Sequence, residues 1–452
     1  MKTNPVSTFT WIPLTVQDED EDLVPVISAE KEFFYDEDGN EWIDGISSWW
    51  TVIHGHRHPK ITQAIETQLK SLDHIILAGH VHRPAEMLSK KLLELADNDF
   101  EKVFYSDNGS NAVEIALKLA IQYYKNQIIE TTEETQNSSN GVPSRESFLI
   151  FSSSYHGDSI GSMNVSGLTY FNRIFANLRF PTFETPAPNC FQCRFGKTPD
   201  ICKTECLDSL EKEILKKKYA GVVIEPLVFG AAGMIFYDRK VLEKIRTLCE
   251  KTNTLLILDE VFTGMGRLGK NFAYQLAGVK PDLLAIAKGL TGGSLPLAAT
   301  LVSKKIYSRF QTKDPFRSFF HAHTMTGNAV SCAAGIASVD LLLSEKDLVP
   351  SLQTKLQILM EELQKRLGGK LKNPRVLGAI AAFDWPEEIA EDEYLNPVGK
   401  EIRNQLKKNF VLLRPLGRTI YITPPYTISP VSLEKIFHAL YDVLSNLGRR
   451  SE

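Results

Sequence analysis

Two charged residues stand directly after apolar runs in the middle of the chain. Asp259 ends the run TLLILD, and Lys288 ends the run LLAIAK. In an open α/β sheet, ligands gather at the carboxyl ends of the strands, so a carboxylate and an amine at two such ends can face one cofactor. On spacing alone, an ion pair or two solvated charges explain these residues more simply.

A third motif stands at the start of a predicted helix. The segment SDNGS ends with Gly109 and Ser110, and a Gly-Ser step at a helix start offers backbone N–H groups and a hydroxyl to an anion. Alone, such a step is usually a plain helix cap. Together with Asp259 and Lys288, it completes the set that pyridoxal phosphate needs: an amine, a carboxylate for the pyridine nitrogen and a phosphate cup.

The elements around these motifs have an α/β pattern. Apolar residues at helical spacing predict helices at 59–74 and 110–124. Short apolar runs without alternation indicate strands buried on both faces of a parallel sheet. These runs lie at residues 148–151, 222–224, 255–258, 283–287 and 298–302.

After about residue 325 the pattern changes to α+β. We expect a large domain at 61–324 and a small domain that combines residues 1–60 with 325–452. In the small domain, the sequence predicts helices at 329–343 and 352–367 and strands at 376–383 and 421–423.

Composition excludes several classes of protein. The chain has 452 residues, 43% hydrophobic and 23% charged, with a net charge of −4. These values exclude a mainly disordered chain and give no basic excess for nucleic acid. No apolar run approaches the ~18–20 residues of a membrane span, and the first ten residues have no signal-peptide pattern. We therefore expect a cytoplasmic protein without nucleic-acid or membrane partners.

At these motifs the sequence resembles the class III aminotransferases of fold type I. The stretches LDEVFTGMGR at 258–267 and AKGLTGG at 287–293 look like their cofactor signature, and the likeness runs from about residue 42 to 426. The resemblance implies a pyridoxal phosphate enzyme. It also implies a mostly parallel central sheet in the large domain and a smaller α+β domain built from both chain ends.

Other stretches resemble one branch of that class. DGISSWW at 44–50, YHGD at 155–158 and RPLGRTIY at 414–421 are similar to the aminotransferases of biotin synthesis. Those enzymes convert 8-amino-7-oxononanoate into 7,8-diaminononanoate, usually with S-adenosylmethionine as amino donor. The paired tryptophans and the RPLG stretch distinguish this branch from ornithine and GABA transaminases.

The resemblance implies roles for the cofactor residues. Lys288 matches the catalytic lysine, which bonds to the cofactor and then moves a proton. Asp259 matches the partner of the pyridine nitrogen, and Asp158 is expected to support it. Gly109 and Ser110 match the phosphate cup.

Substrate residues follow in the same way. Tyr155 matches the aromatic residue that stacks on the cofactor and contacts substrate. Trp49 and Trp50 offer an apolar wall to a methylene chain, and Arg414 matches the residue that binds a carboxylate. Arg267 matches a second active-site arginine, with a surface ion pair as the alternative.

A further group implies a dimer. His323 and Thr324 match cofactor ligands, and Ala322 matches a substrate contact. In the family the phosphate threonine comes from the neighbouring subunit, so we expect a homodimer with shared active sites. Glu225 is expected near the site without contacting substrate.

The sequence departs from the family near its start. The family usually has tyrosine where Leu14 stands in WIPLT, and Leu14 offers no hydroxyl. Lysine as amino donor therefore stays open, as does another class III transaminase acting on ornithine or GABA. A non-catalytic, metal-linked binding protein is a third interpretation, which the intact Lys288, Asp259 and Ser110 oppose.

Two segments lie outside this scheme. A cluster of cysteines has spacing that resembles a small zinc or iron–sulfur loop, but the gaps are not those of a standard zinc finger. We favour free thiols, and the metal content stays open. The polar stretch 130–146 is predicted to be a flexible insertion. The cysteines are Cys190, Cys193, Cys202 and Cys206.

Overall fold

A seven-stranded sheet forms the centre of the computed structural model, which describes residues 8–15, 23–135, 145–198, 200–385 and 397–450. Neighbouring strands run parallel except where β12 is involved. The predicted α/β fold with a mostly parallel sheet is confirmed, and β12 is the antiparallel exception. In sheet order the strands are β4 (Lys102–Ser106), β12 (Ala298–Val302), β11 (Leu283–Ile286), β10 (Leu255–Asp259), β7 (Tyr219–Ile224), β5 (Ser147–Phe151) and β6 (Thr182–Thr185).

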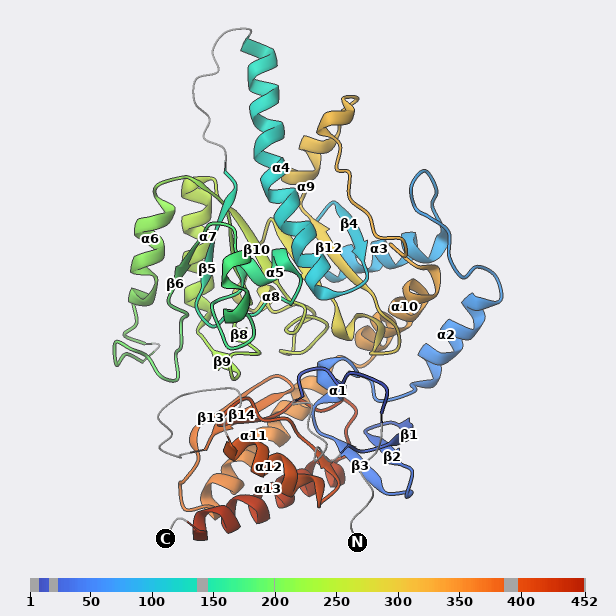
Figure 1. Cartoon of the computed structure of the whole chain (residues 1–452), viewed down its shortest axis with the longest axis vertical. Coiled ribbons are helices and arrows are strands. Elements are labelled where there is room, and N and C mark those ends of the chain that lie inside the picture. Colours follow the sequence, from blue (N-terminus) through green and yellow to red (C-terminus); the bar gives the residue numbers. More distant parts are fainter. Residues whose placement is uncertain (1–7, 16–22, 136–144, 199, 386–396, 451–452) are drawn as a thin grey trace.

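The central strands are apolar on both faces because helices cover both faces. Leu255 and Ile257 of β10 pack in one core cluster with α4 (Gly109–Thr135). Leu256 and Leu258 pack in another with α7 (Arg239–Thr252), as the alternation of a strand requires. Figure 1 shows the long α4 beside the sheet. The strands β4 and β6 were not predicted; they stand at the two edges of the sheet, and both carry partly exposed residues.

Three predicted helices are present with changed bounds. α2 (Pro59–Leu69) begins at its proline, as predicted, but stops short of residue 74. α10 (Ala329–Ser344) matches closely, and it packs on α2 and on α3 (Arg83–Leu95). α4 continues to Thr135, so the predicted insertion begins as helix, and residues 136–144 lie outside the described part.

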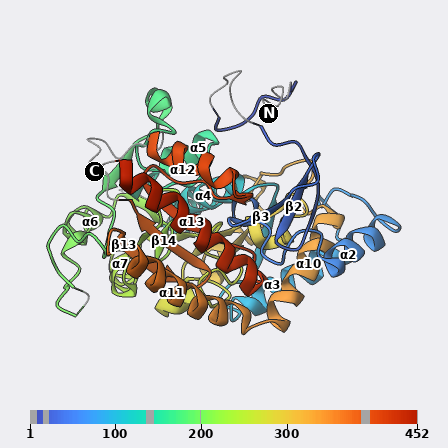
Figure 2. The same cartoon turned by 90° about the horizontal axis from the view of Figure 1, so that it is seen from below.

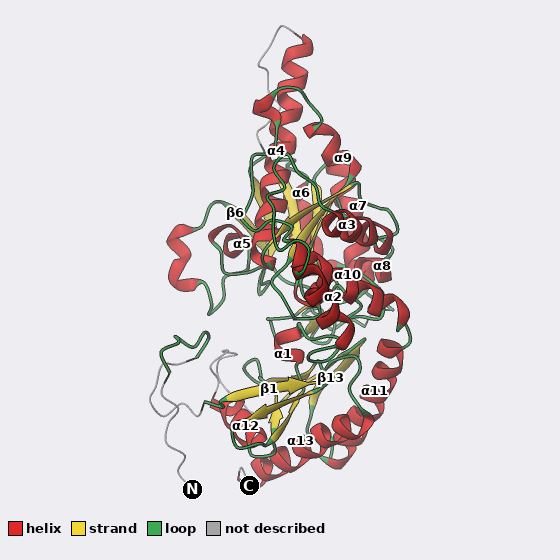
Figure 3. Cartoon of the chain, turned by 90° about the vertical axis from the view of Figure 1, so that its right-hand side faces the viewer, coloured by secondary structure: helices red, strands yellow, loops and turns green. Residues whose placement is uncertain are grey.

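A second region joins the two ends of the chain. β3 (Glu41–Asp44) pairs in parallel with β15 (Val411–Leu412), next to β2 (Phe33–Asp36) and β1 (Val26–Glu30). Figure 3 shows these strands below the central sheet, with α1 (Ser47–Trp50) between the two regions. The pairing agrees with a small domain made from both ends, while the domain bounds stay a prediction.

The strand predicted at 376–383 is in fact a hairpin. β13 (Lys372–Leu377) and β14 (Ile380–Asp384) pair antiparallel, and β14 also pairs with β16 (Thr419–Ile422). The turn needs Gly378, whose φ is 57° and whose Cβ would lie 2.2 Å from the Arg267 carbonyl oxygen.

Helices cover this smaller sheet. α11 (Leu348–Arg366) packs along α13 (Pro430–Arg450), and α12 (Pro397–Lys407) lies beside α13 (Figure 2). Within the described ranges, no helix is both long and apolar enough to cross a membrane.

Candidate active site

A cavity of about 470 Å³ opens at the carboxyl ends of the central strands. Asp259 ends β10, Glu225 follows β7, and Lys288 begins the short helix η3 (Lys288–Thr291) after β11. All three line this cavity. The prediction that strand ends bring the carboxylate and the amine to one place is therefore confirmed.

A buried histidine orients Asp259. The His156 Nδ1 atom lies 2.7 Å from Asp259 Oδ2, and both side chains are almost fully buried. Asp259 Oδ1 accepts a hydrogen bond from the backbone N–H of Val261 at 2.9 Å. The support expected from Asp158 is corrected, because the Asp158 carboxylate accepts instead from the Tyr155 hydroxyl at 2.8 Å. Sequence reasoning missed His156, although it lies in the YHGD stretch.

The start of α4 faces the same cavity. Asn108 caps the helix by accepting from the backbone N–H of Asn111 at 3.0 Å, and Gly109 and Ser110 line the cavity beside it. Gly157 packs against this step: its φ is 124°, and a Cβ there would lie 2.0 Å from Ser110 Oγ. Glycine is therefore required at residue 157. This arrangement fits an anion such as a phosphate.

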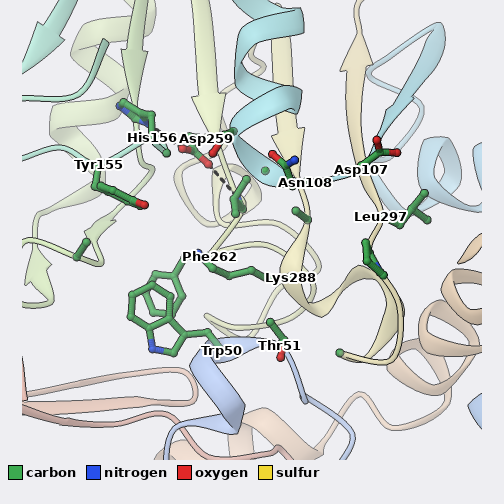
Figure 4. A pocket seen from close by; sticks show the side chains of 18 of the residues that line it. Trp50, Thr51, Asp107, Asn108, Tyr155, His156, Asp259, Phe262, Lys288 and Leu297 are labelled. Atoms are coloured by element: carbon green, nitrogen blue, oxygen red, sulfur yellow. Dashed lines mark hydrogen bonds and ion pairs between the residues drawn. The ribbon is translucent and has the colours of Figure 1, made fainter. Parts of the chain in front are cut away.

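Lys288 lies under aromatic cover. Its Nζ is 4.6 Å from the Trp50 ring centroid and 6.0 Å from that of Phe262, and Figure 4 shows its side chain extending toward both. Burial lowers the pKa of Lys288 to about 8, and the negative charges of Asp259 and Glu225 oppose that shift. At this pKa, about a tenth of the amine is neutral at pH 7.

Glu225 sits at the back of the cavity as expected. Its carboxylate accepts from the backbone N–H groups of Tyr155 at 3.1 Å and Gly230 at 2.9 Å. Burial raises the pKa of Glu225 to about 7, with the Asp259 charge acting in the same direction. These bonds anchor the loop that presents Tyr155.

Arg414 and Trp49 contact each other, and neither lines the cavity. The Arg414 guanidinium lies 5.1 Å from the Trp49 ring centroid. It also donates a hydrogen bond of 2.5 Å from Nη2 to the Leu14 carbonyl oxygen. The segment that carries Leu14 therefore reaches the residue expected to bind a carboxylate.

Arg267 does not line the cavity. It is 1% exposed, so the alternative of a surface ion pair is excluded. Its guanidinium lies behind Trp50, and Nη2 donates to the Trp50 carbonyl oxygen at 2.9 Å.

Comparison with known proteins decides the family. The class III aminotransferase family model matches residues 15–444. The chain belongs to the class III aminotransferases. It is 38% identical to the adenosylmethionine-8-amino-7-oxononanoate aminotransferase of Geobacter sulfurreducens, over 95% of this chain and 94% of that protein. It is 37% identical to the protein of the same name from Synechococcus elongatus, over 97% and 98% of the two chains.

Solved structures agree with that assignment. The adenosylmethionine-8-amino-7-oxononanoate aminotransferase of Methanocaldococcus jannaschii matches with a TM-score of 0.85 at 30% identity, over 97% of both chains. An amine transaminase from an uncultivated Pseudomonas species, in its PLP-bound form, matches with a TM-score of 0.87 at 27% identity over 98% of this chain and 99% of that one. This class III aminotransferase therefore has the fold type I architecture.

In this aminotransferase, the residues expected to come from a neighbouring subunit lie away from the cavity of their own chain. Ala322 and Thr324 are exposed, and His323 is half-buried. His74 Nε2 lies 2.9 Å from the Thr324 carbonyl oxygen, and this contact ties the loop that carries residues 322–324 to the segment that follows α2. None of the three lines the cavity.

The four clustered cysteines surround a cavity of only about 60 Å³. Cys190 Sγ accepts from the backbone N–H of Asp238 at 3.2 Å, and Cys202 Sγ accepts from that of Thr204 at 3.3 Å. Among the described residues, no three or more His, Cys, Asp or Glu side chains are arranged to hold a metal ion. The geometry gives the zinc hypothesis no support.

Proposed function

We propose that the chain catalyses transamination of 8-amino-7-oxononanoate to 7,8-diaminononanoate in biotin synthesis, with pyridoxal phosphate as cofactor and S-adenosylmethionine as amino donor. The observation that carries the proposal is the Lys288 amine in one cavity with Asp259 and the Gly109–Ser110 helix start. The names of the relatives from three organisms support the substrates.

The cofactor residues have distinct tasks. Lys288 is the residue that would bond to the cofactor, because it lines the cavity and its pKa is lowered to about 8. Asp259, oriented by His156, would keep the pyridine nitrogen protonated. Gly109 and Ser110 would hold the phosphate. When bound, the cofactor supplies an electron sink for the electron pair released at the amine carbon.

Lys288 also has a part in the proton transfer. With its amine free, Lys288 would carry the proton between the amine-bearing carbon of the substrate and the reacting carbon of the cofactor. The Trp50 and Phe262 rings lie within 4.6 and 6.0 Å of this amine and cover one side of it. Tyr155 would stack on the cofactor ring, held in place through Glu225 and Asp158.

The remaining residues would select the substrate. Trp49 and Trp50 provide apolar surface for the methylene chain, and Arg414 provides a guanidinium for the terminal carboxylate. That carboxylate would meet Arg414 where the Leu14 carbonyl oxygen now accepts. A second subunit would supply Ala322, His323 and Thr324, so we propose a homodimer with shared sites.

The test of the donor is a half-reaction followed by absorbance. The protein loaded with pyridoxal phosphate is mixed separately with S-adenosylmethionine, lysine, ornithine and GABA. Loss of the visible cofactor band with adenosylmethionine supports the proposal. A response to lysine alone changes the donor, and a response only to ornithine or GABA overturns the substrate assignment while leaving the cofactor assignment intact.

A further inference from the structure

The turn that carries both tryptophans is left-handed. Ser47, Ser48, Trp49 and Trp50 have φ values between 44° and 74°, and none of them is glycine. The backbone N–H of Trp50 donates to the Ile46 carbonyl at 2.8 Å, so the segment forms one turn of left-handed helix. L-residues with side chains adopt this conformation only when their surroundings impose it.

The start of the turn is held by Asp44, which is fully buried. Its carboxylate accepts from the backbone N–H of Ile46 at 3.2 Å and from the Ser48 hydroxyl at 2.8 Å. The Ser47 hydroxyl donates to the Thr423 carbonyl at 2.7 Å. These bonds tie the first half of the turn to the end of β3 and to the residue that follows β16.

The end of the turn is held by Arg267. Besides its bond to the Trp50 carbonyl, the guanidinium contacts two aromatic rings, with centroids 5.1 Å away in Tyr426 and 5.8 Å away in Phe262. Its Nε and Nη1 atoms are buried and have no hydrogen-bond partner among the described residues. A buried guanidinium without a carboxylate is costly, so its single bond to Trp50 calls for a functional explanation.

We propose that Arg267 is a positioning residue for Lys288: by holding the Trp50 carbonyl it keeps the left-handed turn wound and the Trp50 indole against the lysine amine. The ring centroids of Trp50 and Phe262 lie 4.2 Å apart, and the Trp50 ring covers Lys288 Nζ. The adjacent Trp49 ring contacts Arg414 instead. One strained turn thus places the Trp50 ring over the amine and the Trp49 ring beside Arg414. The catalytic meaning of this arrangement rests on the proposed function, but the arrangement itself does not.

The test measures Lys288 in the cofactor-free protein, without any substrate. The rate of acylation of Lys288 is measured by peptide mass spectrometry as a function of pH. The exposure of Trp50 is measured by acrylamide quenching of fluorescence, as the difference between each protein and the same protein carrying Trp50→Phe. Arg267→Met is expected to raise the pKa of Lys288 toward the ordinary lysine value and to increase quenching of Trp50, because water reaches the amine.

Loss of the nearby Arg267 charge would also raise the lysine pKa, so two further variants separate charge from conformation. Ser48→Asn, added to Arg267→Met, favours the left-handed turn without restoring the charge, and it should return the pKa and the quenching toward wild type. Ser48→Thr alone keeps the hydroxyl and the charge but disfavours the turn, because Thr is β-branched. It should shift the Lys288 pKa and the Trp50 quenching in the same direction as Arg267→Met, with a smaller shift in pKa because the Arg267 charge is retained.

Arg375→Met is the matched control. Arg375 is also buried and donates to the backbone carbonyls of Met234 and Gly233, but unlike Arg267 it also pairs with a carboxylate, that of Asp384, at 3.0 Å. None of these residues lines the cavity. It should lower the melting temperature without moving the Lys288 titration. The proposal is overturned if Ser48→Thr leaves the titration unchanged, or if Ser48→Asn fails to reverse Arg267→Met. Absence of aminotransferase activity would contradict the proposed function but not this result.

Discussion

His156 and Asp259 form a buried hydrogen-bonded pair, with Nδ1 and Oδ2 2.7 Å apart and neither side chain more than 5% exposed. The two residues come from different strand ends, after β5 and at the end of β10. The histidine ring fixes the plane of the carboxylate that faces the cavity. A carboxylate with a fixed direction can keep a cofactor nitrogen protonated at little cost in reorganisation.

Replacing the two members of this pair should have graded effects. Asp259→Asn removes the charge and should lower kcat by about 10²–10⁴-fold. His156→Asn keeps the Asp259 charge but removes the bond that orients its carboxylate. It should lower kcat by about 10–100-fold, as is typical for residues that orient a binding group. Single-turnover kinetics with the amino donor would measure both. The exposed His438→Asn serves as control, and a His156→Asn variant with wild-type kcat would contradict the orienting role.

Stability should depend on pH through Glu260. Burial raises the pKa of Glu260 from an ordinary 4.5 to about 8, despite two backbone N–H bonds from Ala273 and Tyr274. The folded chain therefore keeps a proton that the unfolded chain loses. This contribution to stability is fully present below about pH 4.5 and is lost as the pH rises through about 8.

The melting temperature of Glu260→Gln should accordingly fall less steeply than that of wild type between about pH 5 and about pH 8. The variant should be less stable overall by about 1–3 kcal/mol, because an amide leaves one backbone N–H without an acceptor. The exposed Glu94→Gln should follow the wild-type curve. Parallel curves for Glu260→Gln and wild type would show that Glu260 is ionised in the folded state.

The clustered cysteines should be slow to react. Burial raises the pKa of Cys206 to about 11, and it raises the pKa of Cys190 as well. Because the thiolate is the reactive form, iodoacetamide should alkylate both more slowly than free cysteine near neutral pH. A chelator should leave the melting temperature unchanged. Stoichiometric zinc in protein purified without added metal would contradict the free-thiol interpretation.

Shared active sites should permit complementation between subunits. Lys288→Ala removes the amine from one site, and Thr324→Glu places a negative charge where the partner's phosphate is expected to bind. Each variant alone should be inactive. Mixed and refolded together, they form hybrid dimers in which one of two sites carries neither change, so activity should reappear. Complete inactivity of verified hybrid dimers would contradict the sharing of sites.

The sequence predicts a site residue well where that residue directly follows a strand or helix with a clear apolar pattern. Asp259 and Lys288 could be predicted because each ends an apolar run, and strand ends of a parallel sheet meet at one edge. The His156–Asp259 bond could not be predicted, since it joins residues far apart in the chain and Asp158 was an equally plausible partner.

Conformation was harder to predict than chemistry. SSWW gives no sign of a left-handed turn, because residues outside the segment, among them Asp44, Arg267 and Thr423, hold it. The sequence predicts one strand where the hairpin at Gly378 lies, since both arms of the hairpin are apolar near the turn. The sequence does not predict edge strands such as β6, because partly exposed residues interrupt their apolar pattern.

The central claim is the transfer of an amino group to 8-amino-7-oxononanoate, and it can be tested in one assay. The protein loaded with pyridoxal phosphate is incubated with this acceptor and with S-adenosylmethionine whose amino nitrogen is isotopically labelled. We predict labelled 7,8-diaminononanoate, detected by mass spectrometry, and none with Lys288→Ala. Absence of labelled product from a protein that converts ornithine or GABA under the same conditions would contradict the account.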